Sequence, residues 1–230
     1  LVVKRASIEP NFHGLYLSFL DQIKVDGLIK CVLQQTYNNI RVLLQSKKVL
    51  TQSSERSLLK NLGSWLGALT IENNRPVLLR DLDLKTLLLD GYDTEGLLGV
   101  IPFVCKVLEP CGKSKVFKPP NPWVMSLMSL LAELYNKGNL KLHLKFEIEV
   151  LARAMELDLK DLTPTSLLDG RQAKPREASD AATSSSAATA ANAAAGDAAQ
   201  QQSAVQSQHY TPAVAPQHAR APQSSQGQRQ

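Results

Sequence analysis

Apolar residues recur at every third or fourth position through most of residues 1 to 170, with polar residues between them. This spacing is typical of α-helices that each have one apolar face. It predicts seven main helices, and we expect the apolar stripe of each helix to pack against its neighbours. The predicted helices cover about residues 10–23, 27–45, 54–69, 84–91, 95–108, 122–137 and 145–157.

The first three stripes are the most regular in the chain. In the first helix Pro10 lies in the opening turn, where its missing N–H group costs nothing. The stripe of that helix is Phe12, Leu15, Tyr16, Phe19 and Ile23. The stripe of the second is Ile29, Leu33, Tyr37, Ile40 and Leu44. The stripe of the third is Leu58, Leu62, Trp65 and Leu69.

Residues that favour helix N-termini mark several starts, because a side-chain oxygen there accepts a hydrogen bond from a free backbone N–H group. Asn121 followed by Pro122 is the clearest signal, since proline suits the first helical position. Pro102 lies inside the fifth pattern, where it should kink the helix or lie near its start. The other predicted starts are Ser53 or Ser54, Asp83, Thr94 with Glu95, and Thr163-Pro164 for a short last helix through Leu168.

Residues 142 to 150 alternate between apolar and polar types, which is the period of a β-strand. A lone strand in a helical chain would have no partner for its hydrogen bonds. A helical series fits the same residues from Phe146 onward. We therefore expect an extended connector over 140–144 and then a helix with the stripe Phe146, Val150, Ala154 and Leu157.

Gly63 and Gly67 are four residues apart in the third predicted helix, so they share one face. Glycine costs about 1 kcal/mol relative to alanine inside an exposed helix. Two such residues on one face favour close approach of a neighbouring helix over a chance occurrence.

Helices that follow one another through short polar loops favour an all-α fold, an α-solenoid of antiparallel helix pairs. A closed helical bundle is the alternative, because no repeat of fixed period can be read from the chain. We expect the helical domain over residues 1–170. Residues 171–230 contain 18 Ala, 11 Gln and 8 Ser, a composition that predicts a disordered tail or linker.

The net charge of +5 is too small to indicate nucleic-acid binding by itself. One basic cluster, expected to be a solvated loop or else a surface for an acidic partner, contains Lys106, Lys113, Lys115 and Lys118. The three cysteines have no paired spacing, which fits a reducing compartment and thiols that act as small apolar groups. No apolar run is long enough to span a bilayer. We therefore expect a cytoplasmic protein.

No pattern of catalytic or metal-ligating residues stands out. His13 and His143 are far apart in the sequence, and neither has the spacing of a metal site. Gly112-Lys113-Ser114 resembles the end of a phosphate-binding loop, but the glycine that the motif requires is replaced by Val107. We expect no cofactor, no metal and no enzymatic activity, and instead a protein-binding scaffold.

Residues 117 to 123 contain three prolines between two large aromatic residues. Proline restricts the backbone, so this segment is expected to form a rigid elbow between helices, held by Phe117 and Trp123. The same elbow could present Lys118 and the proline edges to a partner.

Four runs of the chain carry a resemblance to a known family: Ile8 to His13, Arg56 to Gly67, Phe117 to Trp123, and Leu144 to Leu151. They resemble the central domain of the scaffold subunit of the Ccr–Not deadenylase complex. That domain is similar to the middle domain of translation initiation factor four-G, a stack of HEAT repeats. The resemblance covers about residues 1 to 170, although Lys118 stands where we would expect arginine.

The resemblance implies a HEAT-like scaffold in mRNA decay and translational repression. The partners it implies are a Caf-type deadenylase, a DEAD-box RNA helicase of the decapping-activator type and other subunits of the complex. It also implies a cytoplasmic location that extends to mRNP granules and the nucleus. The predicted partner-binding residues are Asn39, Arg41, Arg56, Lys60, Asn61, Lys118, Pro119, Pro120 and Asn121.

The alternative function is that of an RNA-binding helical repeat. It would require several lysine–phosphate contacts and hence a steep dependence of RNA affinity on salt. Most aromatic residues lie on the predicted core stripes, which leaves few for base stacking. We therefore expect no direct RNA binding, and an unrecognised enzyme would need a polar pocket with converging titratable groups.

Overall fold

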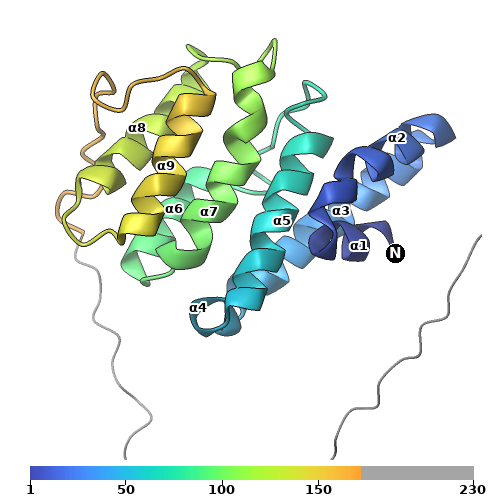
Figure 1. The fold of residues 1–230 in the computed structure, drawn as a ribbon, viewed down its shortest axis with the longest axis horizontal. Helices are drawn as coiled ribbons and strands as arrows, with labels where there is room; N and C mark the ends of the chain where they lie inside the picture. The colour runs from blue at the N-terminus through green and yellow to red at the C-terminus, as the bar shows by residue number, and fades with distance from the viewer. Residues whose placement is uncertain (172–230) are drawn as a thin grey trace, which may run out of the picture. The chain divides into compact units, whose positions relative to one another are not determined.

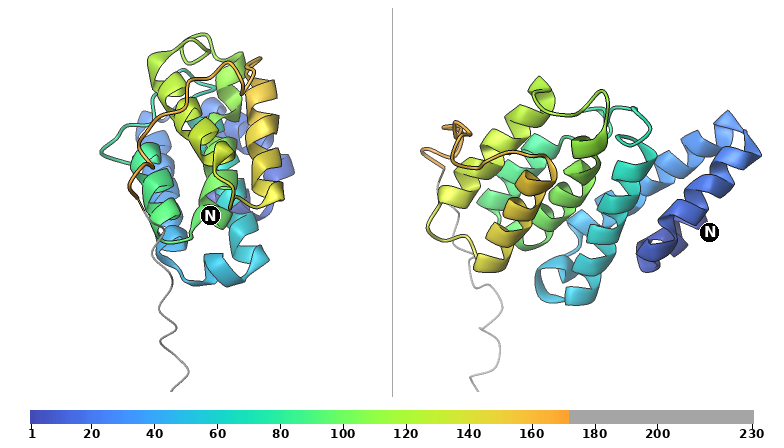
Figure 2. Two further views of the ribbon diagram at one scale, coloured as in Figure 1. Left: turned by 90° about the vertical axis from the view of Figure 1, so that its left-hand side faces the viewer. Right: turned by 45° about the horizontal axis from the view of Figure 1, so that its top comes forward.

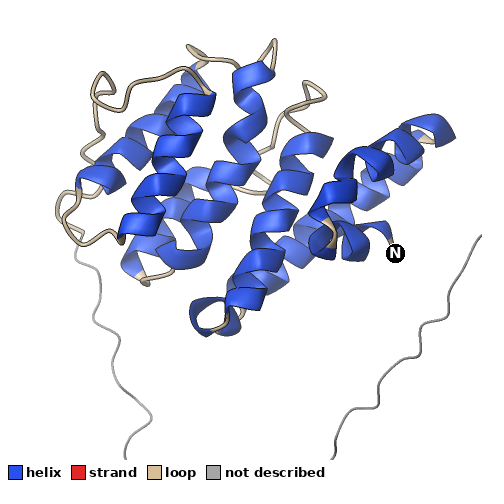
Figure 3. Cartoon of the chain, viewed as in Figure 1, coloured by secondary structure: helices blue, strands red, loops and turns tan. Residues whose placement is uncertain are grey.

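A computed structural model describes residues 1–171, which belong to one compact unit. Helices make up most of these residues and no strand occurs among them (Figure 3). The predicted tail falls almost wholly outside the described residues. The elements are α1 (Val2–Ile8), η1 (Pro10–Phe12), α2 (His13–Ile23), α3 (Asp26–Gln45), α4 (Lys48–Thr51), α5 (Ser53–Leu69), α6 (Leu84–Asp93), α7 (Leu97–Leu108), η2 (Glu109–Lys113), α8 (Pro122–Asn136) and α9 (Leu142–Ala154).

The helices of this unit form two rows. In one row α1, α5, α7 and α9 pack side by side in that order, while α3, α6 and α8 lie behind them (Figure 1). Helices α5, α7 and α9 run in one direction and the second row runs in the opposite direction, as the two further views show (Figure 2). The chain therefore forms a stack of antiparallel helix pairs, which confirms the predicted α-solenoid and excludes a closed bundle for the described residues.

The centre of the stack is the contact between α5 and α7, and it depends on two glycines. A Cβ atom added to Gly63 would lie 2.7 Å from the carbonyl oxygen of Phe103. One added to Gly67 would lie 2.7 Å from the carbonyl oxygen of Val107. Real Cβ atoms do not approach a backbone oxygen so closely, so the prediction that these glycines admit a neighbouring helix is confirmed.

Two of the predicted helix starts are confirmed by their caps. Asp83 accepts hydrogen bonds from the backbone N–H groups of Lys85 and Thr86, at 3.0 and 3.2 Å. Asn121 accepts them from Trp123 and Val124, at 3.0 and 3.4 Å, and its own amide group donates to the carbonyl of Val116. Both residues thus satisfy N–H groups that have no partner within the helix.

Other predicted boundaries are wrong. Helix α5 begins after Gln52 without a side-chain cap, so neither Ser53 nor Ser54 has that role. Thr94 ends α6 instead of opening α7, and Glu95 adopts a positive φ of 58° that no helix start requires. Pro102 lies inside α7, five residues after its start at Leu97, so the helix does not start just before this proline, and the alternative of a kink stays a prediction. Two short helices, α1 and α4, carry too few turns to show a period and were not predicted.

The segment after α9 also differs from the prediction. Residues 163 to 168 form no helix, because the buried carboxylate of Glu133 on α8 takes the place of helical hydrogen-bond acceptors. It accepts bonds from the N–H groups of Leu167 and Leu168, at 3.2 and 2.9 Å, and from the hydroxyl of Thr165. This acid fastens the end of the described chain to the second row.

We expect Asn121→Ala to lower the free energy of unfolding by about 1 kcal/mol, because two N–H groups of α8 lose their acceptor. For a domain of this size the unfolding midpoint would fall by about 2–4 °C. Scanning calorimetry measures both quantities. Asn136→Ala, at the exposed other end of α8, is the matched control and should leave the midpoint unchanged; equal shifts for both variants would contradict the capping role.

Candidate partner-binding surface

The outward face of α2 carries a continuous apolar stripe. Phe12, which immediately precedes α2, Leu15 and Phe19 are 51%, 63% and 53% exposed, and Ile23 extends the stripe to the end of the helix. These are residues of the predicted first stripe, so the expectation that they pack inside the domain is wrong. The stripe lies at one end of the two rows, where α2 has no further helix beyond it within the described residues (Figure 1).

A different face of α2 holds the helix onto α1 and α5. His13 and Leu20 are buried there, and the ring of His13 packs on Trp65 of α5 at a centroid distance of 5.3 Å. The Nε2 group of His13 donates a hydrogen bond to the carbonyl oxygen of Ala6 at 2.7 Å. Because these contacts fix the rotation of α2, they also fix the direction in which the apolar stripe points.

Tyr16 is the one member of the predicted stripe that turns toward the domain. Its ring meets Trp65 edge-on at a centroid distance of 6.5 Å, and its hydroxyl donates to the carboxylate of Glu9. That hydrogen bond raises the pKa of Tyr16 above its usual value, because it would be lost from a charged phenolate. Arg5 pairs with the same carboxylate at 2.6 Å, which ties α1 and α2 together.

The burial of His13 predicts a pH dependence of stability. Burial lowers the pKa of His13 below its ordinary 6.5, so the imidazole is neutral in the folded chain and gains a proton on unfolding in mild acid. A lowered histidine pKa therefore stabilises the fold above the unfolded-state pKa, and this stability is lost as the pH falls through about 6.5.

We expect the wild-type unfolding midpoint in urea to fall between about pH 7.5 and pH 5.5 by more than that of His13→Gln, because only the histidine must take up a proton on unfolding. Urea titrations at several pH values measure the difference. His143→Gln, at an exposed histidine, is the matched control and should follow the wild-type curve. Parallel curves for wild type and His13→Gln would contradict the assignment.

The structure gives three of the predicted contact residues an internal role. Arg56 of α5 donates from Nη1 to the carbonyl oxygens of Val49 and Leu50, at 3.2 and 3.5 Å. Asn61 donates to the carbonyl oxygen of Ser7 at 2.8 Å, which joins α5 to α1.

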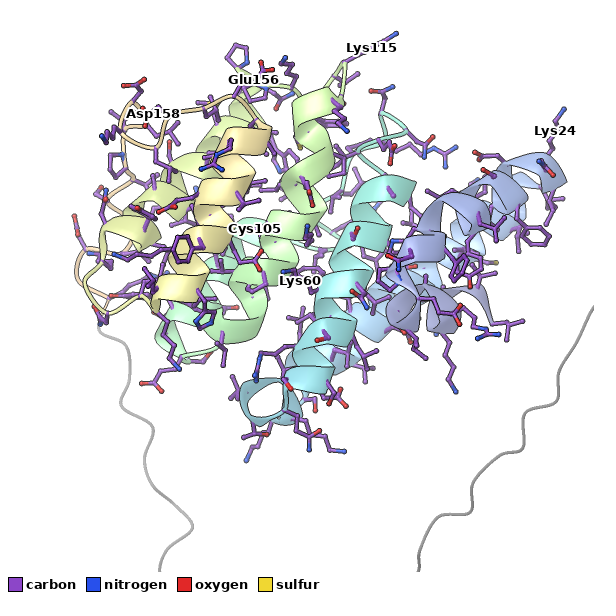
Figure 4. The ribbon with its side chains drawn as sticks, viewed as in Figure 1. Lys24, Lys60, Cys105, Lys115, Glu156 and Asp158 are labelled. Carbon is purple, nitrogen blue, oxygen red and sulfur yellow. The ribbon has the colours of Figure 1, made fainter. Side chains whose placement is uncertain are left out.

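The third of these residues, Lys60, reaches past α7 to pair with Glu147 of α9. Figure 4 shows Lys60 at the front of the stack beside Cys105 of α7. These interactions across helices could not be read from the sequence, because the paired residues are up to 87 positions apart. A role of Arg56, Lys60 and Asn61 in binding a partner stays a prediction.

Asn39 and Arg41 lie on α3, in the second row. Arg41 donates to the carbonyl oxygen of Asp81 at 2.5 Å, and its guanidinium lies 6.0 Å from the centroid of the Tyr37 ring. Asn39 accepts a hydrogen bond from Gln35 at 3.3 Å. Both side chains are half-buried, so each offers part of its surface to solvent.

The proline-rich elbow forms as predicted. Phe117 is buried, and its ring packs edge-on against Trp123 at a centroid distance of 5.9 Å. The peptide bond between Pro119 and Pro120 is cis. Lys118 is exposed and pairs with Glu156 at 3.2 Å. The elbow lies at the end of the stack marked by Lys115 and Glu156 in Figure 4.

The predicted contact residues thus occupy three places: α3, α5 and the elbow. No hydrogen bond or ion pair within residues 1–171 joins the three groups to one another. Two lysines of the predicted basic cluster, Lys113 and Lys115, are exposed. The other two form ion pairs, Lys118 with Glu156 and Lys106 with Glu109.

A second exposed apolar stripe runs along α9. Leu142, Phe146 and Val150 are each more than half exposed, while Leu144, Ile148 and Leu151 form the buried face. The helix predicted over 145–157 is largely confirmed by α9, but it begins at Leu142, so the extended connector over 140–144 is wrong from Leu142 onward. The stripe predicted from Phe146 is also wrong as a buried face, because Phe146, Val150 and Ala154 are exposed. The alternating spacing of the apolar residues fits two helix faces, and the packing against α7, α8 and η2 selects which of them is buried.

The sequence profile described as the CCR4-NOT transcription complex subunit 1 CAF1-binding domain matches residues 1–178. The chain belongs to this family. It is 47% identical over 173 residues to the CCR4-NOT transcription complex subunit let-711 of Caenorhabditis elegans. It is 41% identical over 167 residues and 38% identical over 169 residues to the proteins named general negative regulator of transcription subunit 1 of Schizosaccharomyces pombe and Saccharomyces cerevisiae.

These comparisons cover 73 to 74% of the chain but only 7 to 8% of each relative. The chain therefore corresponds to a small part of a large scaffold subunit of the CCR4–NOT complex. The predicted resemblance to that subunit is confirmed.

The described residues hold no group of three or more metal-ligating side chains, and no helix among them is long and apolar enough to cross a membrane. Cys105 and Cys111 are buried, and burial raises the pKa of the Cys111 thiol to about 12. These two thiols act as small apolar groups, as predicted, whereas Cys31 is exposed.

Proposed function

We propose that this chain is a non-catalytic module of the CCR4–NOT scaffold that binds a CAF1-type deadenylase through the apolar stripe of α2. The observation that carries the proposal is the exposure of Phe12, Leu15 and Phe19 on one helix face of a domain whose family is described by CAF1 binding. Exposed aromatic and aliphatic residues that lie together are typical of protein–protein interfaces.

The surroundings of the stripe support a protein partner. On one side of the stripe the neighbouring residues on the helix surface are Ser18 and Gln22, which carry no charge. Excluding water from uncharged residues costs less free energy than desolvating charged groups. The contacts of His13 with Ala6 and Trp65 hold the helix in place before the partner arrives, which lowers the entropic cost of binding.

The binding proposal is tested by isothermal titration calorimetry of the full chain with a purified CAF1-type deadenylase. We expect a one-to-one complex with a dissociation constant in the micromolar range or tighter, since interfaces of standard size reach such affinities. No binding heat at micromolar concentrations would contradict the proposal. The chain alone should leave an oligoadenylate substrate intact, because catalysis belongs to the partner.

We propose further that a DEAD-box RNA helicase of the decapping-activator type binds a different part of the same module. The support is the polar surface away from α2, where Asn39 and Arg41 on α3 and Lys118 in the elbow are at least partly exposed. Rigid elements that present polar side chains suit recognition of a folded domain.

The helicase proposal is tested by adding the helicase to the preformed complex with the deadenylase. A ternary complex in size-exclusion chromatography is the expected result. Lys118→Glu combined with Asn39→Ala should reduce helicase binding and leave deadenylase binding unchanged. Competition between the two partners would contradict separate surfaces. RNA affinity measured in parallel should be weak at physiological salt, whereas tight and salt-sensitive binding would favour the alternative function.

A further inference from the structure

A groove of about 390 Å³ opens at the end of the stack where the connection between α6 and α7 meets the connection between α8 and α9. It shares no residue with the stripe of α2 or with the elbow. Its volume is within the range typical of ligand pockets. Besides Tyr92, its apolar lining consists of Leu50, Leu97, Leu98, Leu134, Leu140 and Leu144.

The rim of the groove is polar and carries cations near the start of α9. Lys137 and Lys141 both line it, together with Asn139 from the loop between them. Lys137 pairs with Asp169 at 3.3 Å, whereas Lys141 is exposed and has no ion-pair partner among residues 1–171. Glu95 contributes one carboxylate from the connection between α6 and α7.

The first turn of α9 adds to the positive potential at this rim. Lys141 occupies the N-cap position without a side-chain hydrogen bond, and the first turn contains no acidic residue. The N-terminal end of a helix attracts negative charge. An acidic group placed beside Leu142 would therefore meet a lysine, free backbone N–H groups and the helix dipole together.

We propose that this groove binds a short peptide segment of a partner protein that places a large apolar side chain between the leucines and an acidic residue beside Lys141. The apolar lining explains the first requirement, and charge complementarity with Lys141 and the α9 N-terminus explains the second. Such short segments bind pre-formed clefts through one or two buried side chains while the rest of the segment stays extended.

The charges around the groove favour an acidic residue next to the apolar side chain of the peptide. A basic residue at that place could form an ion pair only with Glu95, and it would be repelled by Lys141 and by the positive end of α9. A fully apolar segment would leave the rim lysine and the N–H groups of α9 without partners, which costs free energy when water is displaced.

The test uses the full chain as bait for a phage-displayed library of random peptides of about twelve residues. The enriched peptides should share a Leu, Ile, Phe or Trp residue close to Asp or Glu. Their affinity, measured by fluorescence anisotropy, should fall at least about tenfold with Leu98→Glu, which places a carboxylate in the apolar lining, and with Lys141→Glu, which reverses the charge at the rim. Glu95→Gln should leave the affinity unchanged or raise it.

Two control variants test whether the loss of affinity is specific to the groove. Val42→Glu places the same charge at an exposed apolar residue of α3, and Lys47→Glu reverses an exposed lysine elsewhere, so both should bind the peptides like the wild type. A peptide whose acidic residue is changed to lysine should lose affinity for the wild type and regain it with Lys141→Glu. Circular dichroism of Leu98→Glu checks that the variant remains folded.

Several outcomes would overturn the proposal. No enrichment, enriched peptides without an acidic residue, or affinities insensitive to Leu98→Glu would each do so. A photo-crosslinking amino acid at Asn139 should label the bound peptide, whereas labelling of a second copy of the chain or of its own residues 172–230 would assign the groove to another occupant. Loss of CAF1-type deadenylase binding with Leu98→Glu would show that the groove belongs to that interface instead.

Discussion

Replacing Gly67 by alanine is expected to lower the free energy of unfolding by about 2 kcal/mol, although alanine is the better helix former. The added Cβ atom would lie 2.7 Å from the carbonyl oxygen of Val107 and 3.2 Å from that of Lys106. Both are backbone atoms of α7 and cannot move aside as a flexible side chain could. The two central helices would have to separate, which weakens the contact on which the stack is built.

The control is the same substitution at a glycine with free space around it. A Cβ atom added to Gly14 of α2 would meet nothing within 4 Å, so Gly14→Ala should stabilise the chain by up to about 1 kcal/mol. Urea denaturation compares the two variants with the wild type. We expect shifts of opposite sign, and a Gly67→Ala variant as stable as Gly14→Ala would show that α5 and α7 do not approach so closely in solution.

The second large effect is expected on binding. Phe19→Glu should weaken the complex with a CAF1-type deadenylase by about a hundredfold, which corresponds to about 2.7 kcal/mol. The new carboxylate would have to be buried in an apolar interface without a partner. Stability should change by less than about 0.5 kcal/mol, because Phe19 is 53% exposed and makes no core contact that the fold requires.

A matched variant separates this effect from a general loss of surface hydrophobicity. Val42 on α3 is 66% exposed, and Val42→Glu should leave the dissociation constant unchanged. Calorimetric titrations of the wild type, Phe19→Glu and Val42→Glu with the deadenylase measure the three dissociation constants. If Phe19→Glu binds as tightly as the wild type while Val42→Glu does not, the deadenylase uses the second row and not α2.

The sequence was sufficient to predict the helical stack, because apolar residues that recur with a period of about 3.6 along successive segments indicate helices that have apolar faces to bury. The starts at Asp83 and Asn121 were predictable for a local reason, since a capping side chain acts within three residues of itself. The close approach at Gly63 and Gly67 was predictable because glycine is costly in a helix unless packing requires it.

What the sequence could not show is which apolar face each helix buries. Both α2 and α9 have apolar residues on two faces, and the regular series from Phe12 and from Phe146 are the exposed ones. The choice is made by neighbours distant in the chain, such as Trp65 against His13. The same limit applies to the site residues, because Lys60 and Asn61 find partners on α9 and α1 that no local pattern reveals.

Hydrogen–deuterium exchange of the chain alone and in complex with a CAF1-type deadenylase tests the central claim most directly. Residues 12 to 23 should become protected from exchange in the complex, while α8 in the second row should exchange at the same rate in both states. Unchanged exchange across α2, with new protection confined to other helices, would contradict the claim that its apolar stripe binds the deadenylase.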